Sequence, residues 1–287
     1  MKTASQTTAP KKAPAKDGDV LVSPAWLAVH LSDPAVRIVE VDVSPTCYDE
    51  WHIDGSVLWN IYRDLKDAEY CLIDADGLER LIAGSGISPD SAVVFYGYGP
   101  AMGCWLMKLY GRADARILDA SRGAWQASDL PRSTSATRPA TAGYRLGVAD
   151  AGIRADLPAM RDAAGRSRAT IADVRSAEEY RGERFWPPGG LKPNGRAGQV
   201  PSAVHLPIDG LYDEHGLFRP LADLSGIFSA IDLNGDDDDV ITYCTIGGRA
   251  CTAWFVLIYL LGRERVRVYD GSWAEWGRHA GAPVQQS

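Results

Sequence analysis

The two halves of this chain repeat each other, and the repeat constrains the fold more than any other feature. Five segments of the first half recur in the second half in the same order and with similar residues. The matched segments are 39–42 with 171–175, 52–57 with 199–205, 93–97 with 240–244, 109–112 with 260–263, and 117–119 with 268–270. Long matches in one order predict tandem copies of one domain, and 287 residues are enough for two.

Each copy alternates short strand-like segments with helix-like segments. The strand-like segments are rich in β-branched residues. One helix is expected to begin at Ser23-Pro24, with serine as the N-cap and proline in the first helical position. Another is expected over Ser176 to Tyr180, with acidic residues in its first turn. The alternation predicts an α/β fold of tandem domains, each a mostly parallel sheet flanked by helices.

Composition marks the expected domain limits. Residues 1–18 are rich in Ala, Thr, Lys and Pro and lack the apolar core of a secretory signal, so we expect a disordered tail. A run rich in Pro, Ser, Thr and Arg begins at residue 129 and is typical of an irregular linker. We therefore predict a first domain over 19–128, a linker and connecting segment over 129–165, and a second domain over 166–287.

The bulk composition argues against several kinds of protein. The net charge of −7 disfavours nucleic-acid binding, which needs a basic surface. No apolar run is long enough to span a bilayer, so no membrane contact is expected. The five cysteines are spread out and form no CxxC pair, which disfavours both a disulfide framework and a zinc site. A cytoplasmic protein without a bound metal fits these observations best.

Cys244 has the setting of a reactive thiol. It ends the apolar, β-branched run 240–243, and a long apolar segment from Ala250 to Leu261 follows the short loop behind it. This order places the thiol at the carboxyl end of a strand and at the start of a helix, where α/β proteins carry their chemistry. Backbone N–H groups and the helix dipole at such a position favour the nucleophilic thiolate form of a cysteine.

The repeat supplies an internal control for this thiol. The position that matches Cys244 in the first half is Gly97, which has no side chain. We therefore expect a catalytic second domain and a first domain that serves as scaffold and cleft wall. The alternative is that Cys244 is a small buried apolar residue, the usual fate of a free cysteine. Cys104 and Cys251 occupy matching positions, and core packing is expected for both.

The residues behind Cys244 have the composition of an anion-binding loop. They are Thr245, Ile246, Gly247, Gly248 and Arg249. The two glycines allow successive backbone N–H groups to turn inward without a clash at Cβ. Arg249 adds a positive charge, and two roles stay open for it. It orients the substrate, or it bonds a buried carboxylate such as Asp173 and holds the loop.

Three segments give the chain a family resemblance. Residues 173–180 resemble the Asp-Val-Arg-Ser-Pro-x-Glu-Tyr segment of the two-domain rhodanese-type sulfurtransferases, and residues 52–57 resemble their His-Ile-Pro-Gly-Ala segment. Residues 243–276 are the most specific match and resemble bacterial thiosulfate sulfurtransferases in particular. The resemblance covers about residues 20–284. It implies two rhodanese-like domains, of which only the second is catalytic, an active site in the cleft between them, and no metal or organic cofactor.

The resemblance also implies a chemistry. The Cys244 thiolate would attack the outer sulfur of a sulfane donor such as thiosulfate, and the enzyme would keep that sulfur as a persulfide. Cyanide or a thiol would then accept it, so the expected partners are a small-molecule sulfur donor and a small acceptor. The loop N–H groups would stabilise the negative charge of these states. A monomer is the expectation for this family.

Charge at the loop separates the possible donors. Thr245 and Ile246 are neutral where thiosulfate-specific relatives often carry Arg or Lys. Lys192 and Arg196, on a long loop, either supply the missing charge or are ordinary exposed basic residues. The neutral pair keeps open a persulfide carrier or binding module without independent turnover. A 3-mercaptopyruvate sulfurtransferase is a further alternative, although its loop motif is absent and Glu179 stands where those relatives place Arg.

A phosphatase or arsenate reductase on the same fold is the remaining alternative. Those enzymes wrap a tetrahedral oxyanion in a Cys-x5-Arg loop, whereas the spacing from Cys244 to Arg249 is Cys-x4-Arg. The shorter loop suits a terminal sulfur atom and leaves little room for phosphate.

Overall fold

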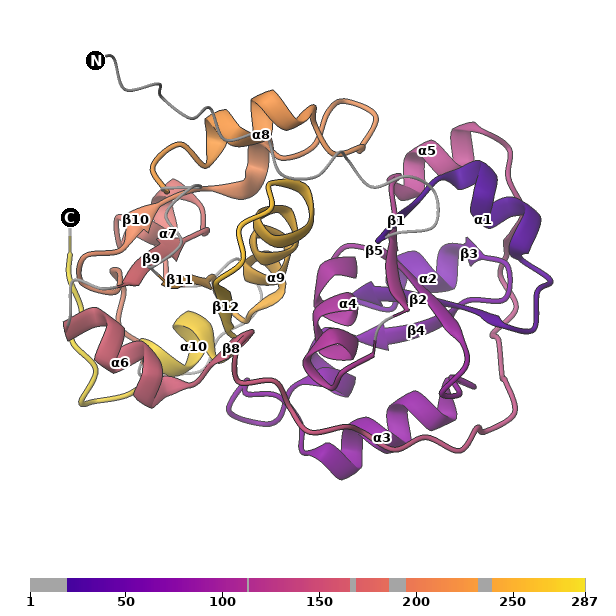
Figure 1. Ribbon diagram of the computed structural model, residues 1–287, viewed down its shortest axis with the longest axis horizontal. Helices are drawn as coiled ribbons and strands as arrows, with labels where there is room; N and C mark the ends of the chain where they lie inside the picture. Colours follow the sequence, from indigo (N-terminus) through magenta and orange to yellow (C-terminus); the bar gives the residue numbers. More distant parts are fainter. Residues whose placement is uncertain (1–19, 113, 166–168, 186–194, 232–238, 287) are drawn as a thin grey trace, which may run out of the picture.

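Two parallel sheets, one in each half of the chain, organise the protein (Figure 1). The computed structural model describes residues 20–112, 114–165, 169–185, 195–231 and 239–286. Each sheet has five strands, and every pair of neighbours within these two sheets is parallel. Helices flank both sheets, so the predicted α/β fold is confirmed. The predicted tail, residues 1–18, lies outside the described residues.

The first sheet has the strand order β1-β6-β5-β2-β4. Its strands are β1 (Leu21–Val22), β2 (Val36–Asp42), β4 (Val57–Asn60), β5 (Ala92–Gly97) and β6 (Ala115–Leu118). The helices of this half are α1 (Pro24–His30), α2 (Thr46–Glu50), the π-helical turn η1 (Ile61–Leu65), α3 (Ala75–Gly84), α4 (Pro100–Leu109) and α5 (Arg122–Ala127). A separate antiparallel pair consists of β3 (His52–Ile53) and β7 (Arg132–Ser133).

The second sheet has the strand order β8-β12-β11-β9-β10, which repeats the first sheet strand for strand. Its strands are β8 (Arg154–Ala155), β9 (Ala169–Asp173), β10 (Val204–His205), β11 (Asp239–Tyr243) and β12 (Val266–Tyr269). The helices are α6 (Leu157–Gly165), α7 (Ala177–Tyr180), the 3-10 turn η2 (Ile208–Gly210), α8 (Leu221–Ile227), α9 (Gly248–Phe255), the π-helical turn η3 (Val256–Leu260) and α10 (Ser272–Trp276). The repeat seen in the sequence is therefore a repeat of topology.

Both predicted helix starts are confirmed by their caps. The Ser23 side chain accepts a hydrogen bond from the Trp26 N–H at 3.1 Å, and Pro24 is the first residue of α1. At the start of α7, the Ser176 side chain accepts from the Glu179 N–H and the Glu179 side chain accepts from the Ser176 N–H. This reciprocal capping box holds the side chain of Glu179 at a defined place at the edge of the second sheet.

The segment between the two sheets runs along the first domain. Residues 134–150 form neither helix nor strand. The Ala142 N–H donates to the Ala83 carbonyl at 3.0 Å, and the Leu146 N–H donates to Glu79 Oε1 at 2.9 Å, so hydrogen bonds tie this segment to α3. Strand β8, which lies inside the expected connecting segment 129–165, joins the edge of the second sheet. The domain limits themselves stay a prediction.

The two domains share a hydrophobic core where α4 packs against α9. Each of these helices follows the central strand of its own sheet, β5 or β11. Ile61 lies between their starts, since its Cδ1 atom would be 3.0 Å from a Cβ at Gly99 and 3.8 Å from a Cβ at Gly248. The carboxyl ends of the two central strands thus point to one place at the domain junction.

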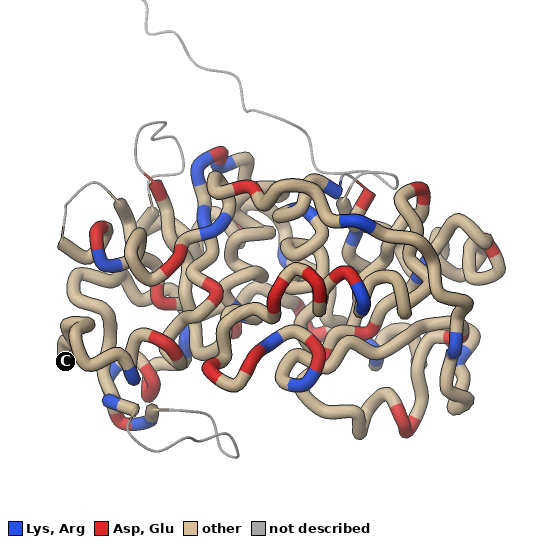
Figure 2. Tube along the Cα trace, turned by 90° about the horizontal axis from the view of Figure 1, so that it is seen from below, with Lys and Arg blue, Asp and Glu red and all other residues tan. Residues whose placement is uncertain are grey.

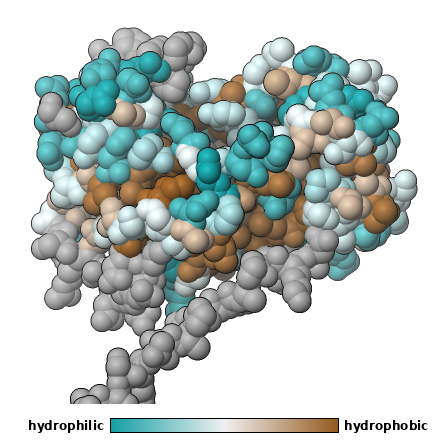
Figure 3. Space-filling model, turned by 90° about the horizontal axis from the view of Figure 1, so that it is seen from above, coloured by the Kyte–Doolittle hydropathy of each residue, from teal (hydrophilic) through white to brown (hydrophobic). Residues whose placement is uncertain are grey.

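The surface combines charged and apolar residues. Acidic and basic residues are interspersed on the face seen from below (Figure 2). Seen from above, the molecule is notched between two lobes, and apolar residues are exposed there in patches among polar ones (Figure 3). In the part of the chain that the structure describes, no helix has the length and apolar character needed to cross a bilayer.

Candidate active site

Cys244 follows β11 directly and opens a four-residue loop that ends where α9 begins at Gly248. This is the strand-to-helix position that the sequence predicts. The residue is buried, with 1% of its surface exposed. The Gly247 N–H donates a hydrogen bond to Cys244 Sγ over a distance of 3.2 Å. The loop therefore aims a backbone donor at the sulfur atom, at the N-terminal end of a helix whose dipole favours an anion.

Gly247 is required for this geometry. Its φ of +96° lies in the left-handed region, where residues other than glycine are strained. A Cβ at this position would also lie 3.0 Å from the Asp270 carbonyl oxygen and 3.5 Å from Lys66 Nζ. The absence of a side chain lets the loop close tightly over the residues behind it.

The other side of the loop is held by the segment after β12. The Cys244 N–H donates to Ser272 Oγ at 3.1 Å, and the Ser272 hydroxyl donates to the Tyr269 carbonyl at 2.8 Å. The Trp273 N–H donates to the Cys244 carbonyl, and the Ala274 N–H donates to the Thr245 carbonyl, both at 2.9 Å. These bonds fix the backbone of the first two residues of the loop, Cys244 and Thr245.

Arg249 binds a buried carboxylate, but not the one named as an example. Its Nη1 and Nη2 atoms donate to the two carboxylate oxygens of Glu179, each at 2.9 Å. The Thr245 hydroxyl donates to Glu179 Oε1 at 2.6 Å and accepts from Arg249 Nη2 at 2.5 Å. Asp173 instead pairs with Arg175 inside the domain, so naming Asp173 was wrong. The start of α7 supplies the partner because its capping box presents Glu179 toward the loop.

The charges of this pair stabilise each other. Burial alone would raise the pKa of Glu179, but the hydrogen bonds and charge of Arg249 outweigh burial and hold this pKa below its usual value of 4.5. Burial opposes the charge of Arg249, and interaction with Cys244 and Glu179 outweighs it, so the pKa of Arg249 is raised. Both members of the pair also bind the hydroxyl of Thr245, the residue that follows Cys244.

The first domain contributes a lysine to the back of the loop. The Lys66 side chain is fully buried, and its Nζ atom donates to the Asp270 carbonyl at 2.7 Å and lies 3.9 Å from Asp270 Oδ2. The Leu72 N–H donates to the same carboxylate at 3.3 Å, and Arg154 Nε donates to it at 2.8 Å. Asp270 thus joins the first domain to the segment that carries Ser272.

The structure brings together the whole predicted loop, and adds residues that the sequence reasoning missed. Thr245, Ile246 and Gly248 are buried with Cys244. The missed residues are Glu179, Ser272, Asp270 and Lys66. Three of these lie in two of the three segments that carry the family resemblance, which was the available signal. Lys66 lies outside all three segments and carried no such signal.

Of the two candidate cations of the long loop, Arg196 lies among the described residues and contacts the C-terminal segment. Arg196 donates to the carbonyls of Gly277, Trp276 and His279, so it holds the C-terminal segment. Lys192 lies outside the described residues. The charge that Thr245 and Ile246 lack is therefore not replaced by Arg196.

The remaining buried cysteines belong to the core. Cys104 on α4 and Cys251 on α9 have no exposed surface. Burial raises the pKa of Cys104 to about 12 and raises the pKa of Cys251 well above its usual value. Core packing, as predicted for this matched pair, is confirmed.

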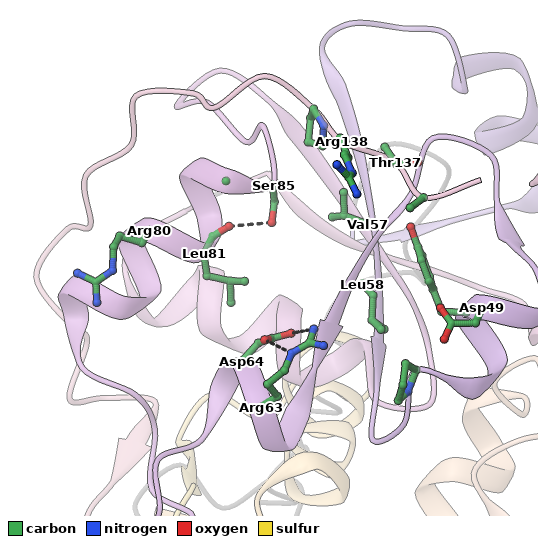
Figure 4. A pocket seen from close by; sticks show the side chains of 15 residues that line it. Asp49, Val57, Leu58, Arg63, Asp64, Arg80, Leu81, Ser85, Thr137 and Arg138 are labelled. Carbon is green, nitrogen blue, oxygen red and sulfur yellow. Dashed lines mark hydrogen bonds and ion pairs between the residues drawn. The ribbon is translucent and has the colours of Figure 1, made fainter. Parts of the chain in front are cut away.

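A cavity with a volume of about 740 Å³ lies in the first domain (Figure 4). It is lined by residues from η1, α3 and the segment 136–139, and none of the residues from Cys244 to Arg249 lines it. Arg63 and Asp64, which face this cavity, form an ion pair with each other at 2.7 Å. The cavity is thus separate from the Cys244 loop, and the loop remains the candidate for the chemistry.

Known proteins match the chain along most of its length. Residues 156–279 match the model of the rhodanese-like domain. The chain is 37% identical over 278 residues to "Putative thiosulfate sulfurtransferase SseA" of Mycobacterium bovis, which covers 92% of this chain and 90% of that protein. It is 34% identical over 279 residues to "Sulfur carrier protein TtuD" of Thermus thermophilus, which covers 93% of this chain and 96% of that protein.

A solved structure has the same fold. It is the anaerobic ergothioneine biosynthesis enzyme from Chlorobium limicola, with a TM-score of 0.82 over 93% of this chain and 70% of that chain. The two are 19% identical, so this likeness concerns the fold alone. The repeated sheets, the match to the rhodanese-like domain and the full-length relatives lead to one conclusion. The chain belongs to the two-domain rhodanese-type sulfurtransferases.

Proposed function

We propose that Cys244 is the nucleophile of this sulfurtransferase and carries the transferred sulfur as a persulfide. The contact between the Gly247 N–H and Cys244 Sγ, 3.2 Å long, is the observation that supports this most directly. A backbone donor at the start of a helix stabilises a thiolate, and it can stabilise a persulfide anion in the same way. Gly97, at the matching position of the first domain, has no side chain and so offers no nucleophile.

The proposed reaction has two steps. In the first, the Cys244 thiolate attacks the outer sulfur of thiosulfate; a bond between the two sulfurs forms, the sulfur–sulfur bond of thiosulfate breaks, and sulfite leaves with the electron pair. In the second, cyanide attacks the outer sulfur of the persulfide and leaves as thiocyanate, which regenerates the thiolate. A thiol acceptor would take the same sulfur and leave as a persulfide. The scheme is covalent catalysis with ping-pong kinetics.

The enclosure of Cys244 favours a terminal sulfur atom over phosphate. Only 1% of the residue is exposed, its backbone N–H is bound by Ser272, and the loop closes back on its sulfur through the Gly247 N–H. A single atom at the end of a donor can reach such a thiol. A tetrahedral oxyanion needs several donors arranged around it, which suits the longer Cys-x5-Arg loop better.

A sulfur carrier is the second candidate. A relative named as a sulfur carrier protein aligns with nearly the whole chain. The cations Lys66 and Arg249, on the two sides of the loop, are each paired with a carboxylate, which weakens the attraction for thiosulfate. In this role Cys244 would form the same persulfide, received from another protein, and turnover with thiosulfate would be slow.

We also propose the reducing cytoplasm as the compartment and a monomer as the working form. All five cysteines are free thiols. Cys47 is exposed and Cys71 is partly exposed, so both would be open to oxidation in an oxidising compartment.

Steady-state formation of thiocyanate from thiosulfate and cyanide tests the proposed role of Cys244. Cys244→Ala is expected to lose roughly a thousandfold or more of the wild-type rate, since no other thiol lies in the loop. Cys47→Ala removes an exposed thiol and is the matched control, which should keep the wild-type rate. Equal rates for the wild type and Cys244→Ala would refute the assignment.

A further inference from the structure

The carboxylate of Glu179 is paired with Arg249, the arginine at the start of α9. Both terminal nitrogens of Arg249 donate to the Glu179 carboxylate at 2.9 Å, and the Thr245 hydroxyl completes the group. Glu179 is buried, with 1% of its surface exposed, and the capping box of α7 fixes its position. Because Nη1 and Nη2 both donate to Glu179, Arg249 cannot offer these two nitrogens as a pair to a bound anion.

The other buried cations around the loop are paired as well. Lys66 lies behind the loop with Asp270, and its side chain has no exposed surface. Arg175 forms an ion pair with Asp173 at 2.6 Å, and both side chains are fully buried. Arg249, Lys66 and Arg175 therefore each have a carboxylate partner before a substrate arrives, and Lys66 shares its partner, Asp270, with Arg154.

This arrangement matters because sulfur donors differ in charge. Thiosulfate is a dianion, whereas a small alkyl persulfide carries a single negative charge at most on its reacting end. A donor must approach the negative charge of the Cys244 thiolate, while the positive charge of Arg249 is already compensated by Glu179. Like charges in a partly buried site repel strongly, and the repulsion grows with the charge of the donor.

We propose that Glu179 decides which sulfur donor the enzyme accepts, by holding Arg249 and so disfavouring thiosulfate relative to singly charged persulfides. Glu179 acts through Arg249 and is a positioning residue. The inference rests on the proposed persulfide chemistry at Cys244. With an alkyl persulfide, the Cys244 thiolate bonds to the outer sulfur, the sulfur–sulfur bond of the donor breaks, and an alkyl thiolate leaves. Atoms and charge balance without any further reactant.

The test measures kcat/KM for two donors, thiosulfate and the persulfide of 2-mercaptoethanol, with cyanide as the acceptor. Glu179→Gln keeps the size of the side chain and one of its two accepting oxygens, so the bond from either Ser176 or Thr245 can remain, but it removes the charge that holds Arg249. The ratio of kcat/KM for thiosulfate to that for the persulfide is expected to rise about tenfold. This ratio does not depend on the fraction of folded protein, so a loss of stability cannot imitate the effect.

Glu178→Gln is the matched control. It removes the same charge from the same turn of α7, but the charged neighbours of Glu178 are Arg181 and Arg184. The donor ratio should stay within about twofold of the wild type. The background Arg249→Gln tests the route of the effect, because Glu179→Gln should no longer change the ratio once Arg249 is neutral.

Two results overturn the inference. One is an unchanged donor ratio in Glu179→Gln, and the other is an equal rise in Glu178→Gln. Cys244→Ala, assayed with both donors, keeps this question apart from the proposed function. If it loses both activities while Glu179→Gln leaves the ratio unchanged, only the role of Glu179 fails. If it keeps either activity, the persulfide chemistry itself fails.

Discussion

The loops after the two central strands start from the same place in the fold and differ in what they can hold. After β5, α4 begins three residues beyond Gly97; after β11, α9 begins four residues beyond Cys244. Gly97 has a φ of +103°, and a Cβ there would lie 2.9 Å from the Val41 carbonyl oxygen. A position between a strand end and a helix start is therefore not enough to hold a catalytic thiol. The backbone at that position must also leave room for a side chain, which it does at Cys244 and not at Gly97.

A second pair of residues at matching positions, both aspartates, shows how the two sides of the domain junction differ. Asp119 and Asp270 follow β6 and β12, and each accepts a backbone N–H from the other domain at 3.3 Å, from Phe218 and Leu72 respectively. Only Asp270 also binds cations. The backbone contacts of the junction are thus repeated in both domains, while the buried charges are concentrated behind the catalytic loop.

The largest expected effect concerns the two loops. Gly97→Cys, placed in a Cys244→Ala protein, should restore no thiocyanate formation, because the first loop lacks both the space for a side chain and the glycine N–H that faces the sulfur. The measurement is the steady-state rate with thiosulfate and cyanide. Recovery of more than about one tenth of the wild-type rate would mean that the shorter loop suffices.

The next effect concerns the matched aspartates. Asp270→Asn should lower the free energy of unfolding by about 3 kcal/mol, because it leaves Lys66 without its buried counter-charge. Asp119→Asn should cost about 1 kcal/mol, since one hydrogen bond to a backbone N–H is weakened. Urea unfolding measures both values, and sulfur transfer should fall further in Asp270→Asn. Equal losses of stability and activity in Asp270→Asn and Asp119→Asn would contradict the proposed difference between the two sides of the domain junction.

The smallest effect is a dependence on pH. The pKa of Glu179 is held below 4.5 because the bonds and charge from Arg249 outweigh its burial. A carboxylate whose pKa is lower in the folded protein contributes stability that is complete above its unfolded pKa and is lost as the pH falls through the folded value. From about pH 7 to about pH 3, the wild type should therefore lose on the order of 1 kcal/mol more than Glu179→Gln. Parallel unfolding curves for the two proteins would contradict this coupling.

Much of the fold follows from patterns that are local in sequence. The matched β-branched segments became β2 and β9, β5 and β11, and β6 and β12, and the caps at Ser23 and Ser176 begin helices as expected. The position of Cys244 was predictable for the same reason. A strand end, two glycines and an apolar helix are adjacent in the chain, so no distant contact is needed to place the thiol.

The partners of the loop were not predictable in this way. Binding a carboxylate was one of the two roles left open for Arg249, and its pairing with Glu179 instead of Asp173 depends on how α7 leaves the second sheet. Lys66 reaches Asp270 from the other domain, 204 residues away in sequence. Nothing in the sequence distinguishes a buried lysine from an exposed one, so the role of Lys66 is seen only once the two domains are packed together.

The central claim is that Cys244 alone carries the sulfur, and the mass of its tryptic peptide tests this most directly. Trypsin separates Cys244 from Cys251 because it cleaves after Arg249, which gives each cysteine its own peptide. After incubation with a sulfane donor and alkylation, the peptide that ends at Arg249 should be heavier by one sulfur atom, and the peptide with Cys251 should be unchanged. An added sulfur on another cysteine, or turnover without any sulfur on Cys244, would contradict the account.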